Sequence, residues 1–262
     1  CYPTLWGTDM TGTTPTAAMV LAAGLGLRLR PLTENCPKPL IKLAGRTLLD
    51  RTLDHLVAAG VARAVINLHY LGHMIEAHLS GRAAPAIEFS REDDALLETG
   101  GGVTKALASL GPAAFYVVNA DITWTDGKFP ALRRLAAAWR DRDMDALLLL
   151  QPVTTATGYD GVGDYTHDLA PESGADGQAG PLTRRRERPS APNVFTGVQL
   201  LHPRLFTDAP TGAFSLTRLY DRVEDAGRLY GIIHEGDWHH IGTPAGLAEA
   251  KKRQAGVRSR LS

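Results

Sequence analysis

The stretch LAAGLGLRLRPLTENCPKPL, residues 21–40, decides the fold, because it joins a buried strand to a glycine-rich loop. The apolar run AAMVLAA at 17–23 predicts the strand, and Gly24 and Gly26 open the loop after it. A dinucleotide-binding loop would need a third glycine, but Leu29 holds that position and the three prolines that follow prevent the expected helix. No Gly-Lys-Ser/Thr sequence follows, which excludes a P-loop. The loop nevertheless lies where open α/β sheets place their ligands.

Two cations follow the glycines within this loop. Arg28 offers a planar guanidinium for two-point phosphate contact, and Lys38 offers a compact point charge. Pro37 and Pro39 flank Lys38, and Pro39 biases Lys38 toward an extended backbone, so we expect a stiff segment that presents the ammonium group. From residue types alone, a solvated basic loop explains these residues equally well.

Strand and helix signals alternate along the first part of the chain. Short apolar runs predict strands at 62–68, 86–92, 114–121 and 145–153. Apolar residues at helical spacing predict helices at 46–60, 71–79, 101–111 and 129–142. This alternation favours a Rossmann-like α/β fold, with a mixed, mostly parallel sheet and helices on both faces.

The pattern changes in the second part of the chain. Residues 158–181 are dense in glycine and aspartate, which predicts turns between short antiparallel strands. Further strands are expected at 182–188, 194–201, 228–234 and 237–242, and helices near 216–226 and 244–254. We expect one domain over 17–254, a flexible N-terminal tail at 1–16 and a C-terminal tail at 255–262.

Composition limits the classes of partner. Of 262 residues 44% are hydrophobic, enough for one large core, and the 28 basic residues balance the 28 acidic ones. No overall field would draw the chain to nucleic acid or to an anionic membrane, and no apolar run reaches the roughly 18 residues that span a bilayer. Only Cys1 and Cys36 are present, and the N-terminus lacks a secretory pattern. We therefore expect a cytoplasmic protein.

Several motifs occur in one consistent order. After LAAGLGLRLRPLT and PKPL come ETGGGV at 98–103, VVNAD at 117–121, GVGDY at 161–165, FTGVQLLHPRLF at 195–206, GAFSL at 212–216 and HIGTPAGL at 240–247. Together they resemble the motifs of the sugar-1-phosphate nucleotidyltransferases. The resemblance implies a fold of the nucleotidyltransferase (GT-A) type, with a nucleotide-binding part at 17–150 and a small antiparallel sugar-binding elaboration within 151–254.

The resemblance also implies a reaction. A sugar 1-phosphate attacks the α-phosphorus of a nucleoside triphosphate, and pyrophosphate leaves. Within the family, the chain is most similar to short bacterial enzymes that transfer a uridylyl group from UTP to N-acetylmuramic acid 1-phosphate in cell-wall recycling. Mannose-1-phosphate guanylyltransferases share most of the motifs and remain an alternative. Ser215, where close relatives can carry lysine, leaves the acceptor open, and the sequence leaves the oligomeric state open.

Site residues are carried over by the same resemblance. The catalytic residues would be Arg28, Lys38 and Asp121. Nucleotide contacts would come from Leu21, Ala22, Ala23, Gly24, Gly26, Glu98, Gly100 and Gly101. Sugar contacts would come from Asn119, Asp164, Thr196 and Gly197. Glycines 100–102 would let the nucleobase approach the backbone, although a simple strand-to-helix connector would also need glycine.

Asp121 and His240 are the candidate metal ligands. Asp121 ends a predicted strand and resembles the Mg²⁺ ligand of the family, although a turn cap would also explain it. Relatives usually carry aspartate where this chain has His240, and imidazole is a poorer ligand for Mg²⁺ than carboxylate. Three alternatives stay open: Asp121 and waters hold Mg²⁺ alone, the enzyme prefers Mn²⁺, or the chain is a non-catalytic nucleotide-sugar sensor.

Arginines at 184–186 also lie near the expected sugar site. Because side chains alternate along a strand, either Arg184 and Arg186 or Arg185 alone would point toward the acceptor. A solvated basic strand is an equally good interpretation.

Overall fold

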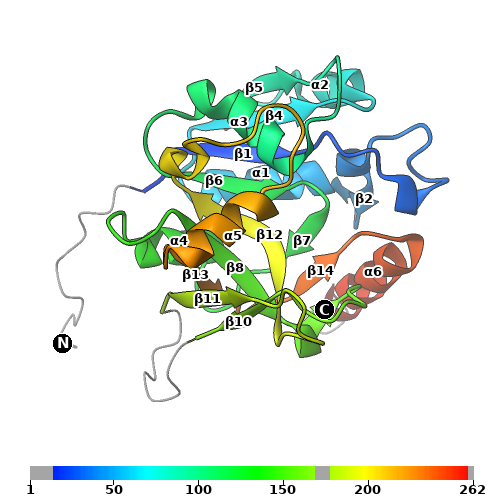
Figure 1. Ribbon diagram of the computed structural model, residues 1–262. Helices are drawn as coiled ribbons and strands as arrows, with labels where there is room; N and C mark the ends of the chain where they lie inside the picture. Colours follow the sequence, from blue (N-terminus) through cyan, green and yellow to red (C-terminus); the bar gives the residue numbers. More distant parts are fainter. Residues whose placement is uncertain (1–13, 169–177, 259–262) are drawn as a thin grey trace, which may run out of the picture.

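The computed structural model describes residues 14–168 and 178–258, with side chains described as far as residue 253. The predicted N-terminal tail therefore lies mostly outside the described residues. A nine-stranded sheet forms the centre of the molecule (Figure 1). In spatial order its strands are β10 (Tyr165–His167), β11 (Gly180–Arg184), β13 (Leu229–Ile233), β8 (Ala146–Pro152), β12 (Asn193–Leu201), β6 (Phe115–Asn119), β1 (Ala17–Leu21), β4 (Arg63–Leu68) and β5 (Ala86–Arg91).

The sheet is mixed and mostly parallel, as the alternation of signals predicts. The four strands β5, β4, β1 and β6 run parallel to one another. Strand β12 then runs antiparallel to both β6 and β8, and β11 runs antiparallel to β13 and β10. All other strands of this sheet point the same way, so their carboxyl ends meet at one edge.

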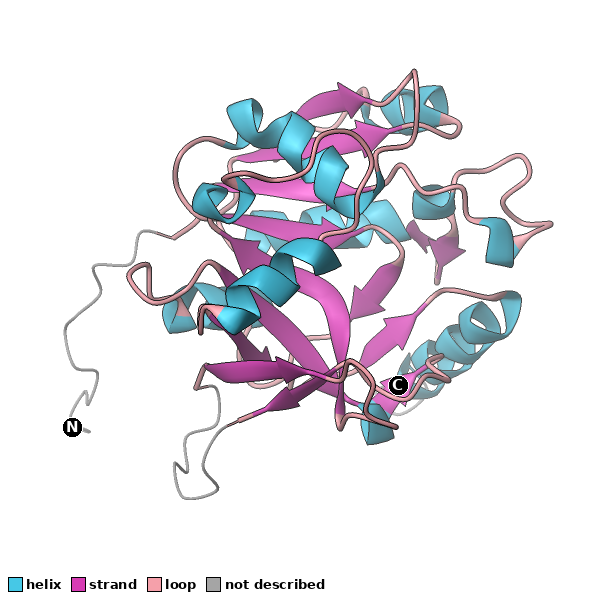
Figure 2. Ribbon diagram, viewed as in Figure 1, coloured by secondary structure: helices cyan, strands magenta, loops and turns pink. Residues whose placement is uncertain are grey.

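Helices cover both faces of the sheet (Figures 1 and 2). Side chains alternate along β1, so Ala18 and Val20 share one core with α1 (Leu48–Ala58), α2 (Gly72–Leu79) and α4 (Ala131–Ala138). Met19 faces the opposite core, which it shares with α3 (Glu98–Leu110) and α5 (Thr217–Asp225). In Figure 1, α3 and α5 lie in front of the sheet and α1 behind it. Two packed layers of helix thus hold the strand ends in place.

Smaller elements surround the carboxyl edge of the sheet. Strand β14 (Trp238–His240) lies between β7 (Ile122–Trp124) and β9 (Ala156–Thr157), and β2 (Lys42–Leu43) pairs with β3 (Arg46–Thr47). Helix α6 (Pro244–Arg258) packs beside β14. A third core joins these elements to the glycine loop; its buried residues are Leu29, Ile41, Leu43, Leu48, Ile241, Leu247 and Ala250. No helix within residues 14–168 and 178–258 is long and apolar enough to cross a membrane.

Several element boundaries differ from those predicted by the sequence. Helix α6 continues to Arg258, past the predicted start of the C-terminal tail at residue 255. Helix α4 ends at Ala138, because Trp139 takes an extended backbone conformation. Helix α3 begins at Glu98, three residues before the helix predicted at 101–111, and so includes Gly100 as well as Gly101 and Gly102.

Candidate active site

The glycine loop leaves the sheet at the carboxyl end of β1. The buried Ala22 N–H donates to the Asn67 Oδ1 atom at 2.7 Å, which holds the first residues after the strand against β4. Gly26 has a φ of 64°, and a Cβ at this position would lie 3.0 Å from the Thr33 Cγ2 atom. The Thr33 hydroxyl donates to the Gly26 carbonyl oxygen. Gly26 therefore needs both its left-handed conformation and its missing side chain.

A buried polar network connects this loop to the start of α3. Asn67 and Glu92 are 3% and 1% exposed, and the Asn67 Nδ2 atom donates to the Glu92 Oε1 atom at 2.7 Å. The Glu92 Oε2 atom accepts the Leu97 backbone N–H at 2.8 Å. The network fixes the two segments predicted to bind the nucleotide relative to each other. The sequence does not predict this network, because a polar residue inside a strand does not show which distant residue it will pair with.

The start of α3 has an unusual backbone. Glu98, its first residue, is exposed and has a φ of 58°, which is uncommon for a residue other than glycine. A Cβ at Gly100 would lie 2.3 Å from the Phe214 ring, and a Cβ at Gly101 would lie 2.2 Å from the Gly212 carbonyl oxygen. These glycines therefore make room for residues 212–214 of the protein, in addition to any room that they leave for a ligand.

Lys38 and Asp121 form an ion pair at the carboxyl edge of the sheet. Lys38 does not take the extended conformation that the sequence predicts; it starts a short 3₁₀ helix, Lys38–Leu40, which the Ile41 N–H closes on the Lys38 carbonyl oxygen. This turn overrides the local bias of Pro39. The Lys38 Nζ atom lies 2.7 Å from the Asp121 Oδ2 atom. Burial raises the pKa of Asp121, but Lys38 and His240 outweigh that effect, so the pKa is lowered and the group is a carboxylate at neutral pH.

His240 lies beside Asp121 through the pairing of two short strands. His240 of β14 stands opposite Ile122 of β7, and the Ile241 N–H donates to the Asp121 carbonyl oxygen at 3.3 Å. Burial lowers the pKa of His240, and Asp121 offsets this only partly. The imidazole is therefore neutral at pH 7 and keeps one ring nitrogen with a free lone pair.

A pocket of about 280 Å³ brings these groups together, and we call it the Asp121 pocket. Its lining residues are Arg28, Asn119, Asp121, Ile122, Tyr159, Asp164, Val194, Phe195, Thr196, Gly197, Trp238 and His240. Seven predicted site residues thus line one pocket, and Lys38 joins them through its ion pair. Arg28 makes no hydrogen bond or ion pair with any other described residue, so its guanidinium is available to a ligand.

A distortion of β12 shapes one wall of the Asp121 pocket. The ladder between β12 and β8 shifts register between Phe195 and Gln199. Gly197 has a φ of 85°, and a Cβ there would lie 2.8 Å from the Asn119 Nδ2 atom. The Thr196 hydroxyl donates to the Leu149 carbonyl oxygen at 2.8 Å, so this buried side chain holds the distortion in place. The hydroxyl of Thr196 is thus used within the protein, and its carbonyl oxygen accepts the Trp238 Nε1–H at 3.0 Å.

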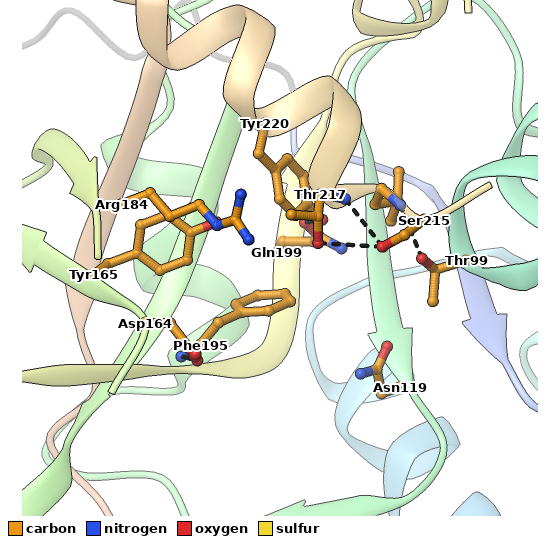
Figure 3. A pocket seen from close by; sticks show the side chains of 11 residues that line it. Thr99, Asn119, Asp164, Tyr165, Arg184, Phe195, Gln199, Ser215, Thr217 and Tyr220 are labelled. Carbon is orange, nitrogen blue, oxygen red and sulfur yellow. Dashed lines mark hydrogen bonds between the residues drawn. The ribbon is translucent and has the colours of Figure 1, made fainter. Parts of the chain in front are cut away.

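A second pocket, of about 240 Å³, adjoins the first and is drawn in Figure 3. We call it the Arg184 pocket. It is lined by Thr99, Asn119, Asp164, Tyr165, Arg184, Phe195, Gln199, Ser215, Leu216, Thr217 and Tyr220. The two pockets share Asn119, Asp164 and Phe195. The Asp164 Oδ2 atom accepts the Phe195 N–H at 2.9 Å, which fixes this shared wall.

The three consecutive arginines have different surroundings. Strand β11 ends at Arg184, earlier than the strand predicted at 182–188, so the rule of alternating faces does not extend to Arg185 and Arg186. Arg184 lines the pocket, whereas Arg186 takes a left-handed conformation and pairs with Asp225 on α5. Arg184 pairs with Asp221 and Arg186 pairs with Asp225, both on α5, at the point where β11 ends. Of the three, Arg184 is the one placed to meet a ligand in this pocket.

Comparisons with known proteins identify the family of this chain. The family described as nucleotidyl transferase matches residues 17–255. A curated relative from Caulobacter vibrioides, N-acetylmuramate alpha-1-phosphate uridylyltransferase, is 42% identical over 92% of this chain and 98% of its own length. A relative of the same name from Neisseria meningitidis serogroup B is 33% identical, over 89% of this chain and 96% of its own.

Among solved structures, a UDP-glucose pyrophosphorylase complexed with UDP-glucose has the same fold. Its TM-score is 0.74 at 15% sequence identity, and the match covers 92% of this chain and 98% of that one. The strand order, the glycine loop at the end of β1 and the match over almost the whole described domain lead to one conclusion. The chain belongs to the nucleotidyl transferase family, whose members transfer nucleotidyl groups to sugar 1-phosphates.

Proposed function

We propose that the chain transfers a uridylyl group from UTP to the phosphate of N-acetylmuramate 1-phosphate, which yields UDP-N-acetylmuramate and pyrophosphate. The observation that carries this proposal is the 42% identity to the uridylyltransferase of Caulobacter vibrioides, which extends over nearly the full length of both chains. The two adjoining pockets support it, because the reaction needs a phosphate site with a sugar site beside it.

The phosphates would lie in the Asp121 pocket. An oxygen of the sugar phosphate attacks the α-phosphorus of UTP, and the bond from that phosphorus to the β-phosphate oxygen breaks. Two polyanions meet in this step, so neutralising and positioning their charges dominates catalysis. Arg28, which has no protein partner among the described residues, would hold the outer phosphates. Lys38 is 10% exposed and held by Asp121, so its ammonium would need little reorganisation to bind the α-phosphate.

The nucleoside and the sugar would occupy the two sides of this centre. The backbone of residues 21–24 and Gly26 on one side, and Glu98, Gly100 and Gly101 on the other, would form the nucleoside site, held together by the Asn67–Glu92 network. Asn119, Asp164 and the backbone of Thr196 and Gly197 would contact the sugar. The left-handed backbone of Glu98 supports a functional role for that position.

Asp121 would hold Mg²⁺, and the donor groups fit that ion. Within the described residues, no group of three or more His, Cys, Asp and Glu side chains forms a metal site. Mg²⁺, however, is often held by one or two carboxylates together with substrate phosphates and waters. Bound there, it would neutralise negative charge on the phosphates. The neutral imidazole of His240 would add a nitrogen donor, which favours Mn²⁺ more than a second carboxylate would.

Two other functions are alternatives to the uridylyltransferase. A mannose-1-phosphate guanylyltransferase would use the same phosphate chemistry with a different base and sugar. A non-catalytic sensor of nucleotide sugars is motivated by His240, because imidazole replaces an expected carboxylate there. For all three functions we propose a cytoplasmic protein. Cys36 is a free thiol, and nucleoside triphosphates and sugar phosphates are found inside cells.

The deciding experiment measures pyrophosphate release for each nucleoside triphosphate with N-acetylmuramate, N-acetylglucosamine and mannose 1-phosphates, with Mg²⁺ and with Mn²⁺. Release with UTP and N-acetylmuramate 1-phosphate supports the proposal, and release only with GTP and mannose 1-phosphate supports the guanylyltransferase. Tight binding of UDP-sugar by folded protein without any release supports the sensor. Asp121→Asn should abolish the response to metal, whereas Asp160→Asn, at an exposed position near the pocket, should keep it.

A further inference from the structure

The Arg184 pocket has the lining of a sugar site with one added charge. Aromatic side chains and neutral hydrogen-bonding groups cover most of its wall (Figure 3). Arg184 is the one lysine or arginine that lines it within residues 14–168 and 178–258. Asp164, on the wall shared with the Asp121 pocket, carries the opposite charge. Asp221 partly neutralises Arg184 through Nη1, so an anionic substituent would be recognised beside Arg184 through its remaining charged N–H donors.

The guanidinium of Arg184 is held in place but only partly used. Its Nη1 atom lies 2.7 and 2.8 Å from the two carboxylate oxygens of Asp221, and its backbone N–H donates to the Glu224 Oε1 atom at 3.1 Å. The Nε and Nη2 groups have no acceptor among the described residues. Together Nε–H and Nη2–H form a side-on fork that matches the two oxygens of a carboxylate.

Gln199 provides an independent sign of a ligand in the same pocket. Its side chain is fully buried, and its Oε1 atom accepts the hydroxyl of Tyr220. Its Nε2 atom, however, has no hydrogen-bond partner among the described residues. A buried donor without an acceptor is destabilising, so such a group is usually paired with a bound water or ligand. A carbonyl or carboxylate oxygen on the sugar would accept this hydrogen bond.

From these observations we infer that the Arg184 pocket recognises the carboxylate of an acidic acceptor sugar. The Nε–H and Nη2–H groups of Arg184 would donate hydrogen bonds to its two oxygens. The inference rests on the proposed function and adds to it a residue that determines specificity. N-acetylmuramate differs from N-acetylglucosamine by a lactyl ether at C3, which ends in a carboxylate. C3 is two ring bonds from C1, so with the C1 phosphate in the Asp121 pocket the lactyl group would reach the adjoining Arg184 pocket. Asp221 then acts as a positioning residue for Arg184.

The test measures kcat/KM for two acceptor substrates with two variants of the protein. The acceptors are N-acetylmuramate 1-phosphate and N-acetylglucosamine 1-phosphate, which lacks the lactyl group. Arg184→Gln should lower kcat/KM for the first about 10- to 100-fold, mainly through KM, because the contact is equal in the ground and transition states. The same variant should change kcat/KM for the second less than about twofold. Arg186→Gln, which removes a charge two residues away on the exposed surface, should change neither.

A neutral substrate provides a second measurement that does not depend on the folding of a variant. The wild-type protein should lose the same 10- to 100-fold factor with the methyl ester of N-acetylmuramate 1-phosphate. In the Arg184→Gln variant the ester and the acid should react equally, since the two changes remove one interaction. If the wild type used the ester as well as the acid, or the variant lost both acceptors equally, the inference would be overturned while the proposed function stood. If the folded wild type failed to transfer to N-acetylmuramate 1-phosphate at all, both would fail.

Discussion

The Lys38 Nζ and Asp121 Oδ2 atoms lie 2.7 Å apart, although the two residues are separated by 83 positions in the sequence. One comes from a short 3₁₀ helix after the glycine loop and the other follows the carboxyl end of β6. Each neutralises the other, with the Lys38 side chain 10% exposed and the Asp121 side chain 34% exposed. The pair therefore places one fixed positive charge and one fixed negative charge at the centre of the site.

Replacing Lys38 tests the catalytic role of this charge. Lys38→Met keeps most of the apolar stem and removes the ammonium, so we expect kcat for pyrophosphate release to fall about 100- to 1,000-fold. The KM for UTP should change much less, because the charge matters most in the transition state. Lys42→Met, at an exposed position on β2, is the matched control. Near-normal turnover by folded Lys38→Met protein would remove Lys38 from the catalytic residues.

Gly24 allows the nucleotide site to be probed without disturbing the fold. A Cβ at Gly24 would meet no protein atom within 4 Å, and its φ is not in the left-handed region. Gly24→Ala should therefore leave the melting temperature unchanged but raise the KM for UTP about tenfold or more, because the methyl group occupies ligand space. Gly81→Ala is the control, since a Cβ there also meets nothing. Equal KM values for UTP in both variants would show that the nucleotide does not bind against the glycine loop.

The buried Glu92 should contribute both to stability and to nucleotide binding. Both of its carboxylate oxygens accept hydrogen bonds, from Asn67 and from the Leu97 N–H. In Glu92→Gln one of these donors would face the new NH₂ group, so we expect the free energy of unfolding to fall by about 1–3 kcal/mol. The KM for UTP should rise as well, since the two walls of the proposed nucleoside site lose their link.

Glu88→Gln is the control for this experiment, because Glu88 is exposed and lies on β5, the strand that ends directly before Glu92. It should change the unfolding free energy by less than about 0.5 kcal/mol. Chemical denaturation measures both values. Equal stability of the two variants would mean that the buried network does not hold the loop and α3 together.

Buried histidines should make the protein less stable in mild acid. Burial lowers the pKa of His234, which is 3% exposed, and also that of His239. Below about pH 6.5 the unfolded chain takes up protons on these residues while the folded protein does not. The free energy of unfolding should therefore fall between pH 7 and pH 5, by at most about 1.4 kcal/mol per pH unit for each such histidine.

His234→Gln removes one of these groups and should flatten the dependence of melting temperature on pH over this range. His73→Gln, on the exposed side of α2, should leave the slope as in the wild type. Carboxylates act in a separate window, because the pKa values of Asp50 and Asp145 are lowered and their contributions are lost only below about pH 4. A slope unaffected by His234→Gln would assign the acid sensitivity to other groups.

Much of the fold could be predicted from the sequence because its signals are local. Apolar runs such as 145–153 match β8, and Gly111 ends α3 where a glycine stop is expected. The position of Asp121 after β6 was also readable, since the end of a predicted strand in a parallel sheet is the edge where ligands bind. Periodicity and chain order are sufficient for these features.

Other features depend on contacts between distant segments, and no local pattern reveals them. Chain order does not show that β12 enters the sheet between β6 and β8 in the opposite direction. The partnership of Asn67 with Glu92 depends on the register of β4 and β5. The orientation of Arg184 depends on where β11 ends, and the turn at Lys38 shows that surroundings can override the bias of a following proline.

The third core of the molecule has a consequence for how the protein is made. Leu29 in the glycine loop packs with Ile241, Leu247 and Ala250, which are synthesised about 200 residues later. During translation the sheet strands around β1 and β4 can pair early, but the apolar core under the loop that carries Arg28 stays incomplete until β14 and α6 have left the ribosome. In a nascent chain the strands beside the proposed nucleoside site would thus form first. The loop that carries Arg28, beside the proposed phosphate site, would become rigid last.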